Sequence, residues 1–216
     1  MFEYLDRDGS EIRAIVFTGS GKNFTAGIDL LSAPMDLMKV REKATESDPG
    51  RAAVMVLDFA FRIQNAISAI EKVRVPVIAA INGLCLGIGN DLISTCDIRI
   101  CQANSRFSIK EVDIGMASDV GIHQRLQKVT GNSSWVRELA LTGRDFDASE
   151  ALAYGYVSRI CQNQEEVLSE AIKTAVIIAE KSPVAVSATK MSLNFSRDHS
   201  VQAGLDHIAL LNSSLL

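Results

Sequence analysis

The sequence predicts an α/β fold in which buried parallel strands alternate with helices and a helical region follows. Two observations lead to this prediction. Short apolar runs that are typical of buried strands alternate with helical stretches in the first two-thirds of the chain, and helical spacing dominates the last third. The 216 residues fit one medium domain with ample chain for a core. We place the α/β core at residues 1–142 and the helical region at residues 143–216.

The first predicted strand is Ala14-Ile15-Val16-Phe17-Thr18, an apolar run that is closed by Gly19-Ser20-Gly21. A long helix is expected from about Arg51 to Val73, because isoleucines recur there with helical spacing and share one face. These isoleucines are Ile63, Ile67 and Ile70.

The next buried strand is Val75–Ile81, and Pro76 falls at its start, where a missing N–H is tolerated. Three glycines follow: Gly83, Gly87 and Gly89. A short helix, roughly Asn90–Thr95, then leads into a further strand, Asp97–Cys101. A strand, a glycine-rich turn, a helix and a strand form a βαβ unit, and strands this apolar indicate a sheet that is covered on both faces.

Helical spacing in the last third places Val167, Ala171, Ala175 and Ile178 on one face. Ser182 is then predicted to cap a helix that has Pro183 at its first position. A final helix carries an apolar face made of Val201, Leu205, Ile208 and Leu211. A terminal amphipathic helix with little chain left to cover it favours self-association.

Composition excludes several classes of function. With 47% hydrophobic and 22% charged residues the chain is not disordered, and no uncharged apolar run approaches the roughly 20 residues of a membrane span. A net charge of −4 without basic blocks argues against nucleic acid as a partner. The first eight residues lack the pattern of a signal peptide, and no targeting signal is expected in this chain.

No motif for a metal or a nucleotide cofactor stands out. The four cysteines, Cys85, Cys96, Cys101 and Cys161, lack CxxC spacing and are expected to be buried, reduced thiols, which suggests an intracellular compartment. The histidines are scattered, so no metal site is predicted. Gly87-Ile88-Gly89 resembles part of a dinucleotide fingerprint, but Leu92 stands where its third glycine would be.

Two turns after predicted strands are candidates for binding a carbonyl oxygen. They are Phe24-Thr25-Ala26-Gly27-Ile28-Asp29-Leu30 and the glycine-rich run from Gly83 to Leu92. Small residues let a ligand approach the backbone, and the second turn opens a helix whose free N–H groups point outward. Two N–H groups from separate loops can stabilise negative charge on one oxygen. The alternative is a pair of ordinary tight turns.

Three acids, Asp91, Glu111 and Asp119, fall in mostly apolar segments near these turns. A carboxylate in apolar surroundings is costly to ionise, so its pKa tends to rise toward the range that suits proton transfer. Helix capping would explain Asp91 or Asp119 singly, since each stands at a predicted helix start. Capping does not explain why three acids fall near two such turns.

Several spaced segments together resemble the enoyl-CoA hydratase/isomerase (crotonase) superfamily over nearly the whole chain. The segment Phe24–Leu30 resembles its first oxyanion motif, and Pro76–Asp97 resembles its second. Three short runs resemble the downstream helical segment of the superfamily: Thr142-Gly143-Arg144, Glu150-Ala151-Leu152 and Gly155-Tyr156-Val157. Within the superfamily, the trio Asp91, Glu111 and Asp119 is similar to that of the delta(3,5)-delta(2,4)-dienoyl-CoA isomerase group.

The resemblance implies a crotonase-like spiral of βαβ units and C-terminal helices that trimerise, usually as a dimer of trimers. It implies an isomerase of fatty-acid β-oxidation that converts 3,5-dienoyl-CoA to 2,4-dienoyl-CoA, in the mitochondrial matrix or the peroxisome, without a cofactor. The thioester oxygen would sit between the N–H groups of Ile28 and Ile88. Glu111 would move the proton at C2 and Asp119 the proton at C6, with Asp91 beside the middle of the dienolate. The acyl-CoA would touch five further residues of the two turns: Ala26, Gly27, Asp29, Gly87 and Gly89.

Two departures from the family pattern produce further expectations. Ile88 stands where the family usually has glycine, so its N–H serves as the second donor only if its φ is negative. The chain also has only 13 residues before Ala14, where relatives carry an N-terminal hairpin that helps to hold CoA. Two alternatives remain open: an enoyl-CoA hydratase in which Glu111 directs water, and an inactive acyl-CoA-binding or scaffold relative.

Overall fold

The computed structural model describes residues 2, 5, 11–29 and 48–215. Four parallel strands form the main sheet in the order β1-β2-β4-β7, with bounds β1 Ile15–Thr18, β2 Val77–Ile81, β4 Ile98–Gln102 and β7 Arg159–Cys161. A smaller sheet has the order β3-β5-β6, with bounds β3 Leu84–Leu86, β5 Arg106–Ser108 and β6 Phe146–Asp147. Its first pair is parallel and its second is antiparallel. The chain therefore winds from one sheet to the other and back, as a crotonase-like spiral does.

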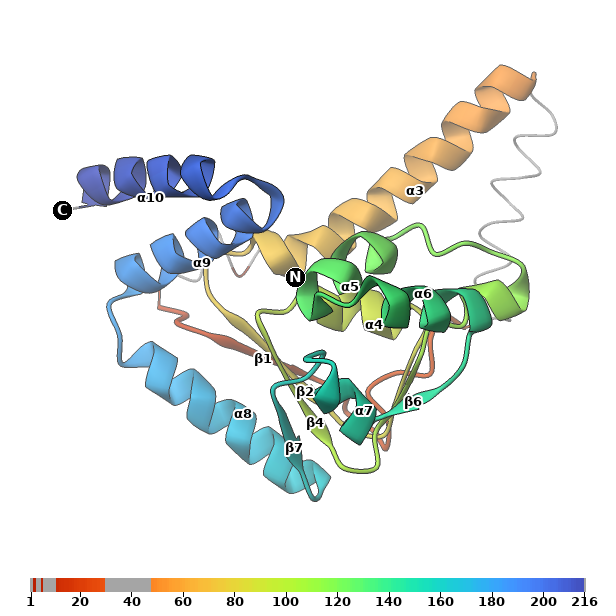
Figure 1. The fold of residues 1–216 in the computed structure, drawn as a ribbon, viewed down its shortest axis with the longest axis horizontal. Coiled ribbons are helices and arrows are strands. Elements are labelled where there is room, and N and C mark those ends of the chain that lie inside the picture. The colour runs from red at the N-terminus through yellow and green to blue at the C-terminus, as the bar shows by residue number, and fades with distance from the viewer. Residues whose placement is uncertain (1, 3–4, 6–10, 30–47, 216) are drawn as a thin grey trace.

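The helices occupy both sides of the main sheet (Figure 1). Their bounds are α3 Pro49–Lys72, α4 Ile88–Ser94, α5 Ile122–Thr130, α6 Ser133–Thr142, α7 Ala148–Ala153, α8 Gln164–Ala179, α9 Pro183–Asp198 and α10 Val201–Leu215, with a 3₁₀ helix, η1, at Glu111–Ile114. One core cluster lies between the main sheet and α8, where Ile78 and Ile100 meet Val167 and Ala171. A larger cluster fills the space between the sheets and the opposite helices.

The strands and helices predicted from periodicity are present within about two residues of their expected bounds. All five residues of β2 are buried, as expected for a central parallel strand. Pro76, which has no N–H, directly precedes β2. The N–H of Val77, the first residue of the strand, donates to Asp97 Oδ2 at 2.7 Å. The buried Lys190 ammonium joins the same oxygen at 2.8 Å, which ties α9 to the sheet. Ser182 caps α9 as predicted, and all four cysteines are free and buried.

The region after residue 142 is less purely helical than its periodicity predicts. Two short strands lie in it: β6 pairs with β5 and β7 pairs with β4. Strands of two and three residues are too short to show a period of two in the sequence. Through these strands the segment 143–161 joins the sheets of the core, and the division at residue 142 stays a prediction.

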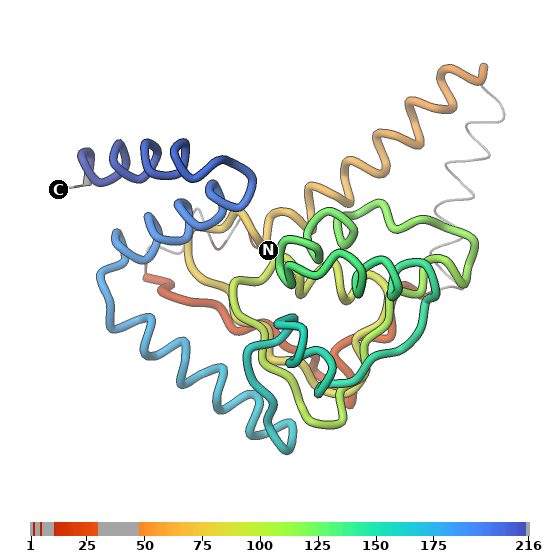
Figure 2. The backbone as a smooth tube through the Cα atoms, viewed as in Figure 1, coloured from red at the N-terminus to blue at the C-terminus, as the bar shows by residue number. Residues whose placement is uncertain are grey.

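The helix α3 projects from the core on one side, and α10 projects on another (Figure 2). By length and composition alone, α3 could cross a membrane, with a mean hydropathy of 1.4 over its most apolar window. One such helix is weak evidence for a membrane span, and the sequence leads us to expect none. Ile67 and Ile70 of its C-terminal part are buried in the core, whereas Val54 and Phe61 are exposed.

Candidate active site

The two turns singled out in the sequence lie against each other. Thr25 pairs with Cys85 in a parallel bridge, its N–H donating to Leu84 O at 3.0 Å and its carbonyl accepting from Leu86 N at 3.1 Å. Gly27 has a φ of 100°, and a Cβ there would stand 3.5 Å from Leu86 O. The backbone that precedes Ile28 is therefore in contact with the backbone that precedes Gly87.

Two glycines shape the second turn for different reasons. Gly87 has φ 51° and ψ −123°, a backbone conformation that residues other than glycine rarely adopt. Gly89 has no such φ, but a Cβ there would collide with the Thr25 Cγ2 atom. Glycine at the first position turns the chain into α4, and glycine at the second lets α4 pack on the first turn.

The backbone conformation of Ile88 meets the condition that the sequence set for its role as a donor. Ile88 is the first residue of α4, and no described residue other than glycine has a positive φ, so its φ is negative. The isoleucine therefore strains nothing and keeps its N–H. In the described part of the chain, no group accepts a hydrogen bond from the N–H of Ile28 or Ile88. Both donors are open to a ligand.

Asp91 is fully buried, yet it does not cap its own helix. Its Oδ1 accepts from the N–H of Ile122 at 2.6 Å, at the start of α5, and lies 3.5 Å from the hydroxyl of the buried Ser118. Its Oδ2 has no hydrogen-bond partner among the described residues. Burial raises the pKa of Asp91 to about 7, and the charge of Glu111 adds to the rise, while the Ile122 N–H and Arg125 oppose it. Asp91 is thus poised to exchange a proton near neutrality.

Glu111 begins η1 and lies beside the second turn. Its Oε1 is 3.3 Å from the position of a Cβ on Gly87, so a larger residue there would press on the carboxyl group. Its Oε2 is buried without a hydrogen-bond partner among the described residues. Burial raises the pKa of Glu111, His123 lowers it, and the charge of Asp119 raises it. A partly desolvated carboxyl group therefore stands next to the residue that precedes the Ile88 donor.

Asp119 differs from the expectation of apolar surroundings, because its side chain is exposed. Three apolar residues between Glu111 and Asp119 are exposed as well: Val112 and Ile114 within η1, and Met116 after it. Asp119 is not a helix cap either: the residue before α5 is Gly121, and Asp91 takes the capping role. The charge of Glu111 nevertheless raises the pKa of Asp91, and the charge of Asp119 raises the pKa of Glu111, so the three acids are linked electrostatically.

Several residues that support this group were missed in the sequence. The buried Asn90 donates to Cys85 O at 3.0 Å and Ser108 O at 2.9 Å, and its Oδ1 accepts from the Tyr156 hydroxyl at 3.1 Å. Asn90 is a side-chain amide in an apolar stretch next to Asp91, and a buried amide needs hydrogen-bond partners, so its supporting role could have been predicted from the sequence. Gln64, Ser118 and Arg125 carry no comparable signal.

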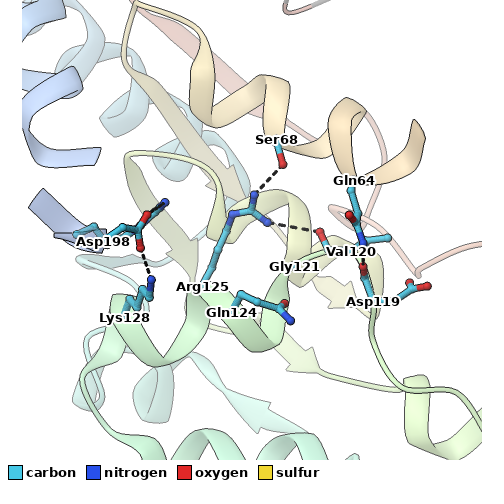
Figure 3. Close-up of a pocket in the computed structure, with 10 residues that line it drawn as sticks. Gln64, Ser68, Asp119, Val120, Gly121, Gln124, Arg125, Lys128 and Asp198 are labelled. Carbon is cyan, nitrogen blue, oxygen red and sulfur yellow. Dashed lines mark hydrogen bonds and ion pairs between the residues drawn. The ribbon is translucent and has the colours of Figure 1, made fainter. Parts of the chain in front are cut away.

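A polar pocket of about 360 Å³ lies beside Asp119 (Figure 3). It is lined by Gln64, Ser68, Asp119, Val120, Gly121, Gln124, Arg125, Lys128, Arg197 and Asp198. The Arg125 guanidinium crosses it, and the Asp119 carboxyl group points away from Lys128 and Asp198. Asp119 therefore lies at the end of the pocket opposite Lys128 and Asp198, and Asp91 and Glu111 are not among the residues that line it.

In the described ranges, no group of three or more His, Cys, Asp or Glu side chains could hold a metal ion. The chemistry that these residues can perform is proton transfer next to a carbonyl oxygen held by amide N–H groups. The raised pKa values of Asp91 and Glu111 suit that chemistry near neutral pH.

Comparisons with known proteins show the family to which the chain is similar. The profile of the enoyl-CoA hydratase/isomerase family matches residues 1–213. The mitochondrial delta(3,5)-delta(2,4)-dienoyl-CoA isomerase of Homo sapiens is 45% identical over 215 residues, which are 100% of this chain and 64% of that protein. The peroxisomal delta(3,5)-delta(2,4)-dienoyl-CoA isomerase of Arabidopsis thaliana is 42% identical over 207 residues, 95% of this chain and 73% of that protein. The chain thus spans somewhat less than two-thirds of the length of the human relative.

Solved structures give the same fold. The enoyl-CoA hydratase of Bacillus anthracis superposes with a TM-score of 0.82 at 28% identity, covering 98% of this chain and 76% of that one. DspI of Pseudomonas aeruginosa superposes with a TM-score of 0.83 at 29% identity, covering 99% of this chain and 75% of that one.

Proposed function

This chain belongs to the enoyl-CoA hydratase/isomerase family, and on that premise we propose that it isomerises 3,5-dienoyl-CoA to 2,4-dienoyl-CoA. The observation that carries the proposal is how near the Glu111 carboxyl group lies to Gly87, where a Cβ would stand 3.3 Å from Glu111 Oε1, one residue before the N–H of Ile88. This proximity brings a carboxyl group of raised pKa beside an amide donor that has no other partner in the described chain. The names of the mitochondrial and peroxisomal relatives support the choice of substrate.

In the proposed reaction the N–H groups of Ile28 and Ile88 bind the thioester oxygen and draw negative charge onto it. This charge withdrawal acidifies C2, and Glu111 takes one C2 proton to leave a dienolate conjugated to C6. Asp119 delivers a proton to C6. One proton leaves C2, one arrives at C6, and both double bonds move by one position. No electrons leave the substrate, so the reaction needs no metal or redox cofactor.

Asp91 is assigned a place beside the middle of the dienolate. Its charge opposes ionisation of Glu111, because the two carboxyl groups interact electrostatically. A neutral Asp91 therefore favours the carboxylate form of Glu111, which is the form that removes the C2 proton. The small residues Ala26, Gly27 and Gly89, with Gly87 and Asp29, are assigned to the walls that the acyl-CoA approaches.

Assembly and location belong to the same proposal. We assign the chain to a homotrimer or a dimer of trimers that acts on acyl-CoA in β-oxidation, in the mitochondrial matrix or the peroxisome. The names of the relatives, mitochondrial for the human protein and peroxisomal for that of Arabidopsis thaliana, support both compartments.

Ultraviolet spectroscopy tests the proposal. Purified protein given 3,5-dienoyl-CoA is expected to generate the absorbance of a 2,4-dienoyl-CoA, and Asp119→Asn is expected to abolish that increase, because C6 then has no proton donor. Glu165→Gln removes an exposed carboxyl group on α8 and is expected to leave the rate unchanged. Folded protein that binds the thioester without any absorbance change would overturn the proposal in favour of an inactive relative. Loss of absorbance from a 2-enoyl-CoA alone would favour a hydratase.

A further inference from the structure

The two acids assigned to C2 and C6 belong to different segments, and these segments have different anchors. Glu111 stands at the start of η1, and Asp119 stands in the connection that follows, which enters α5 at Gly121. No described residue donates a hydrogen bond to the Asp119 carboxyl group, so the position of that group depends on how its backbone is held. Asp91 of α4 binds the flanking residues Ser118 and Ile122, and the contacts to the backbone of residues 119–121 itself come from α3 and α5.

The first contact is a side-chain amide on α3. Gln64 Nε2 donates to the carbonyl oxygen of Asp119 at 2.6 Å. Gln64 lies on the same helix as Ile67 and Ile70, which are buried in the core. The helix that carries this contact is therefore fixed on the core just one turn further along.

The second contact is the guanidinium of Arg125, which closes over the start of α5. It packs directly on Gly121, where a Cβ would collide with Arg125 Nη1, and its Nη1 lies 3.4 Å from Val120 O. Glu71 Oε2 accepts from Arg125 Nε at 2.9 Å, and Ser68 Oγ accepts from Nη2 at 2.9 Å. The Arg125 and Glu71 side chains are 13% and 12% exposed, so this ion pair is largely screened from water.

Glu111 is held from another direction. Its neighbour Lys110 donates to Gly143 O at 2.7 Å and pairs with Asp145 at 3.0 Å and Asp113 at 3.4 Å. These contacts tie η1 to the end of α6. None of them involves α3, Gln64 or Arg125.

The geometry points to Arg125, with Gln64, as the positioning residue of the C6 proton donor: the pair clamps the Asp119 backbone to α3, independently of the anchor that holds Glu111. The inference rests on the proposed isomerisation for its kinetic consequence. In the proposed role, Arg125 touches neither the substrate nor the reacting atoms. It acts through the backbone of residues 119–121.

The clamp predicts that the two proton transfers can be separated by mutation. In deuterated water, wild-type protein is expected to exchange deuterium into C2 of recovered 3,5-dienoyl-CoA and to form 2,4-dienoyl-CoA. Arg125→Met is expected to lower product formation on the order of 100-fold, because displacing a catalytic group by about 1 Å costs that much. Exchange at C2 is expected to stay near the wild-type rate, since Glu111 keeps its anchor. Gln64→Ala is expected to act in the same direction.

The reciprocal variant and a matched control complete the test. Lys110→Met is expected to lower C2 exchange and product formation together, because C2 deprotonation comes first. Lys128→Met removes another cation from α5 and from the same pocket, and it is expected to change neither rate. The inference is overturned if Arg125→Met lowers both rates equally, or if Lys128→Met reproduces its effect.

A measurement without substrate keeps the clamp testable by itself. The N–H groups of Ile122 and Gln124 donate to Asp91 Oδ1 and Gly121 O beside the clamp, so their hydrogen exchange is expected to speed up in Arg125→Met and Gln64→Ala. Exchange at Asp113, whose N–H donates to Lys110 O in η1, is expected to stay unchanged. Unchanged exchange at Ile122 and Gln124 in both variants would overturn the clamp, whatever the enzyme does. If the amides respond but wild-type protein forms no 2,4-dienoyl-CoA, the proposed function fails and the clamp stands.

Discussion

Asp91 shows at the scale of a single residue how position decides chemistry. An aspartate in the first turn of a helix usually caps that helix, but this carboxyl group reaches across to the start of α5 and accepts from Ile122 N–H. Full burial opposes its ionisation, and three groups, the Ile122 N–H, Arg125 and the backbone N–H of Asp91 itself, offset part of that cost. The same residue therefore serves as a cap for a distant helix and as a titrating group at the candidate site.

The raised pKa of Asp91 predicts a specific dependence of stability on pH. Between pH 3.8, the ordinary value, and about 7, the folded state keeps a proton that the unfolded state releases. The contribution of Asp91 to the free energy of unfolding is therefore complete below pH 3.8, falls as pH rises through this window, and is lost above it. One proton sets a slope of at most about 1.4 kcal/mol per pH unit.

Urea unfolding at intervals from pH 4.5 to 8 checks this slope. Asp91→Asn keeps an acceptor for the Ile122 N–H and does not titrate, so its stability is expected to fall less steeply than that of the wild type. Four titratable groups face Asp91: Glu111, Arg125, Cys85 and Tyr156. Glu111 keeps its own titration in the variant. Equal slopes in the two proteins would show that Asp91 does not hold its proton in the folded state.

At the scale of elements, the candidate site depends on a turn that two other segments brace. Gly87 N–H donates to Ser108 O at 2.9 Å at the end of β5, and Asn90 holds the same carbonyl from α4. The Thr25 bridge then closes the first turn on β3. The two amide donors thus stand on backbone that is fixed by two strands, β3 and β5, and one helix, α4, which limits the reorganisation needed on binding.

Gly87→Ala tests this arrangement. Alanine is strained by about 1–3 kcal/mol at this φ and ψ, and its Cβ presses on Glu111 Oε1. We expect kcat to fall about tenfold or more, since both the second donor and Glu111 shift. Gly131→Ala is the matched control, because Gly131 also has a positive φ, 67°, but a Cβ there meets nothing within 4 Å.

The control is expected to lose about 1 kcal/mol of stability and to keep wild-type kcat. Steady-state kinetics and thermal unfolding measure the two effects separately. If both alanine variants lost activity in proportion to stability, the role assigned to Gly87 would be wrong.

At the scale of the whole molecule, the C-terminal helices leave apolar surface uncovered in the single chain. Val201 is 81% exposed, Leu205 55% and Leu210 70%, although α10 lies along α9 on one side. Exposed apolar patches of this kind mark surfaces that associate. The self-association inferred from the sequence remains a prediction, and this surface is where we expect the subunits to contact one another.

Leu205→Glu is therefore expected to shift the protein from an oligomer toward the monomer, because an unpaired carboxylate is costly to bury in an apolar interface. Light scattering coupled to size-exclusion chromatography measures the mass, and circular dichroism verifies the fold. Ser169→Glu adds the same charge to an exposed position on α8 and is expected to leave the mass unchanged. A wild-type protein that stays monomeric across the concentrations tested would contradict the prediction.

Local sequence determined most of the secondary structure and the candidate residues. Apolar runs and helical periodicity are properties of neighbouring residues, so β1, β2, β4, α3 and α8 could be predicted without a structure. The glycines of the two turns and the acids Asp91, Glu111 and Asp119 were visible for the same reason. The family resemblance rested on these segments, and the family profile confirms it.

Only the tertiary structure decided how those residues meet. It placed Asp91 at the start of α5, exposed Asp119, and brought Gln64 and Arg125 of two separate helices to one loop. It also added β6 and β7, whose few residues become strands only beside a partner strand. Burial, pKa and the contacts between distant segments are set by the sum of the packing around each group, and no local pattern in the sequence encodes that sum.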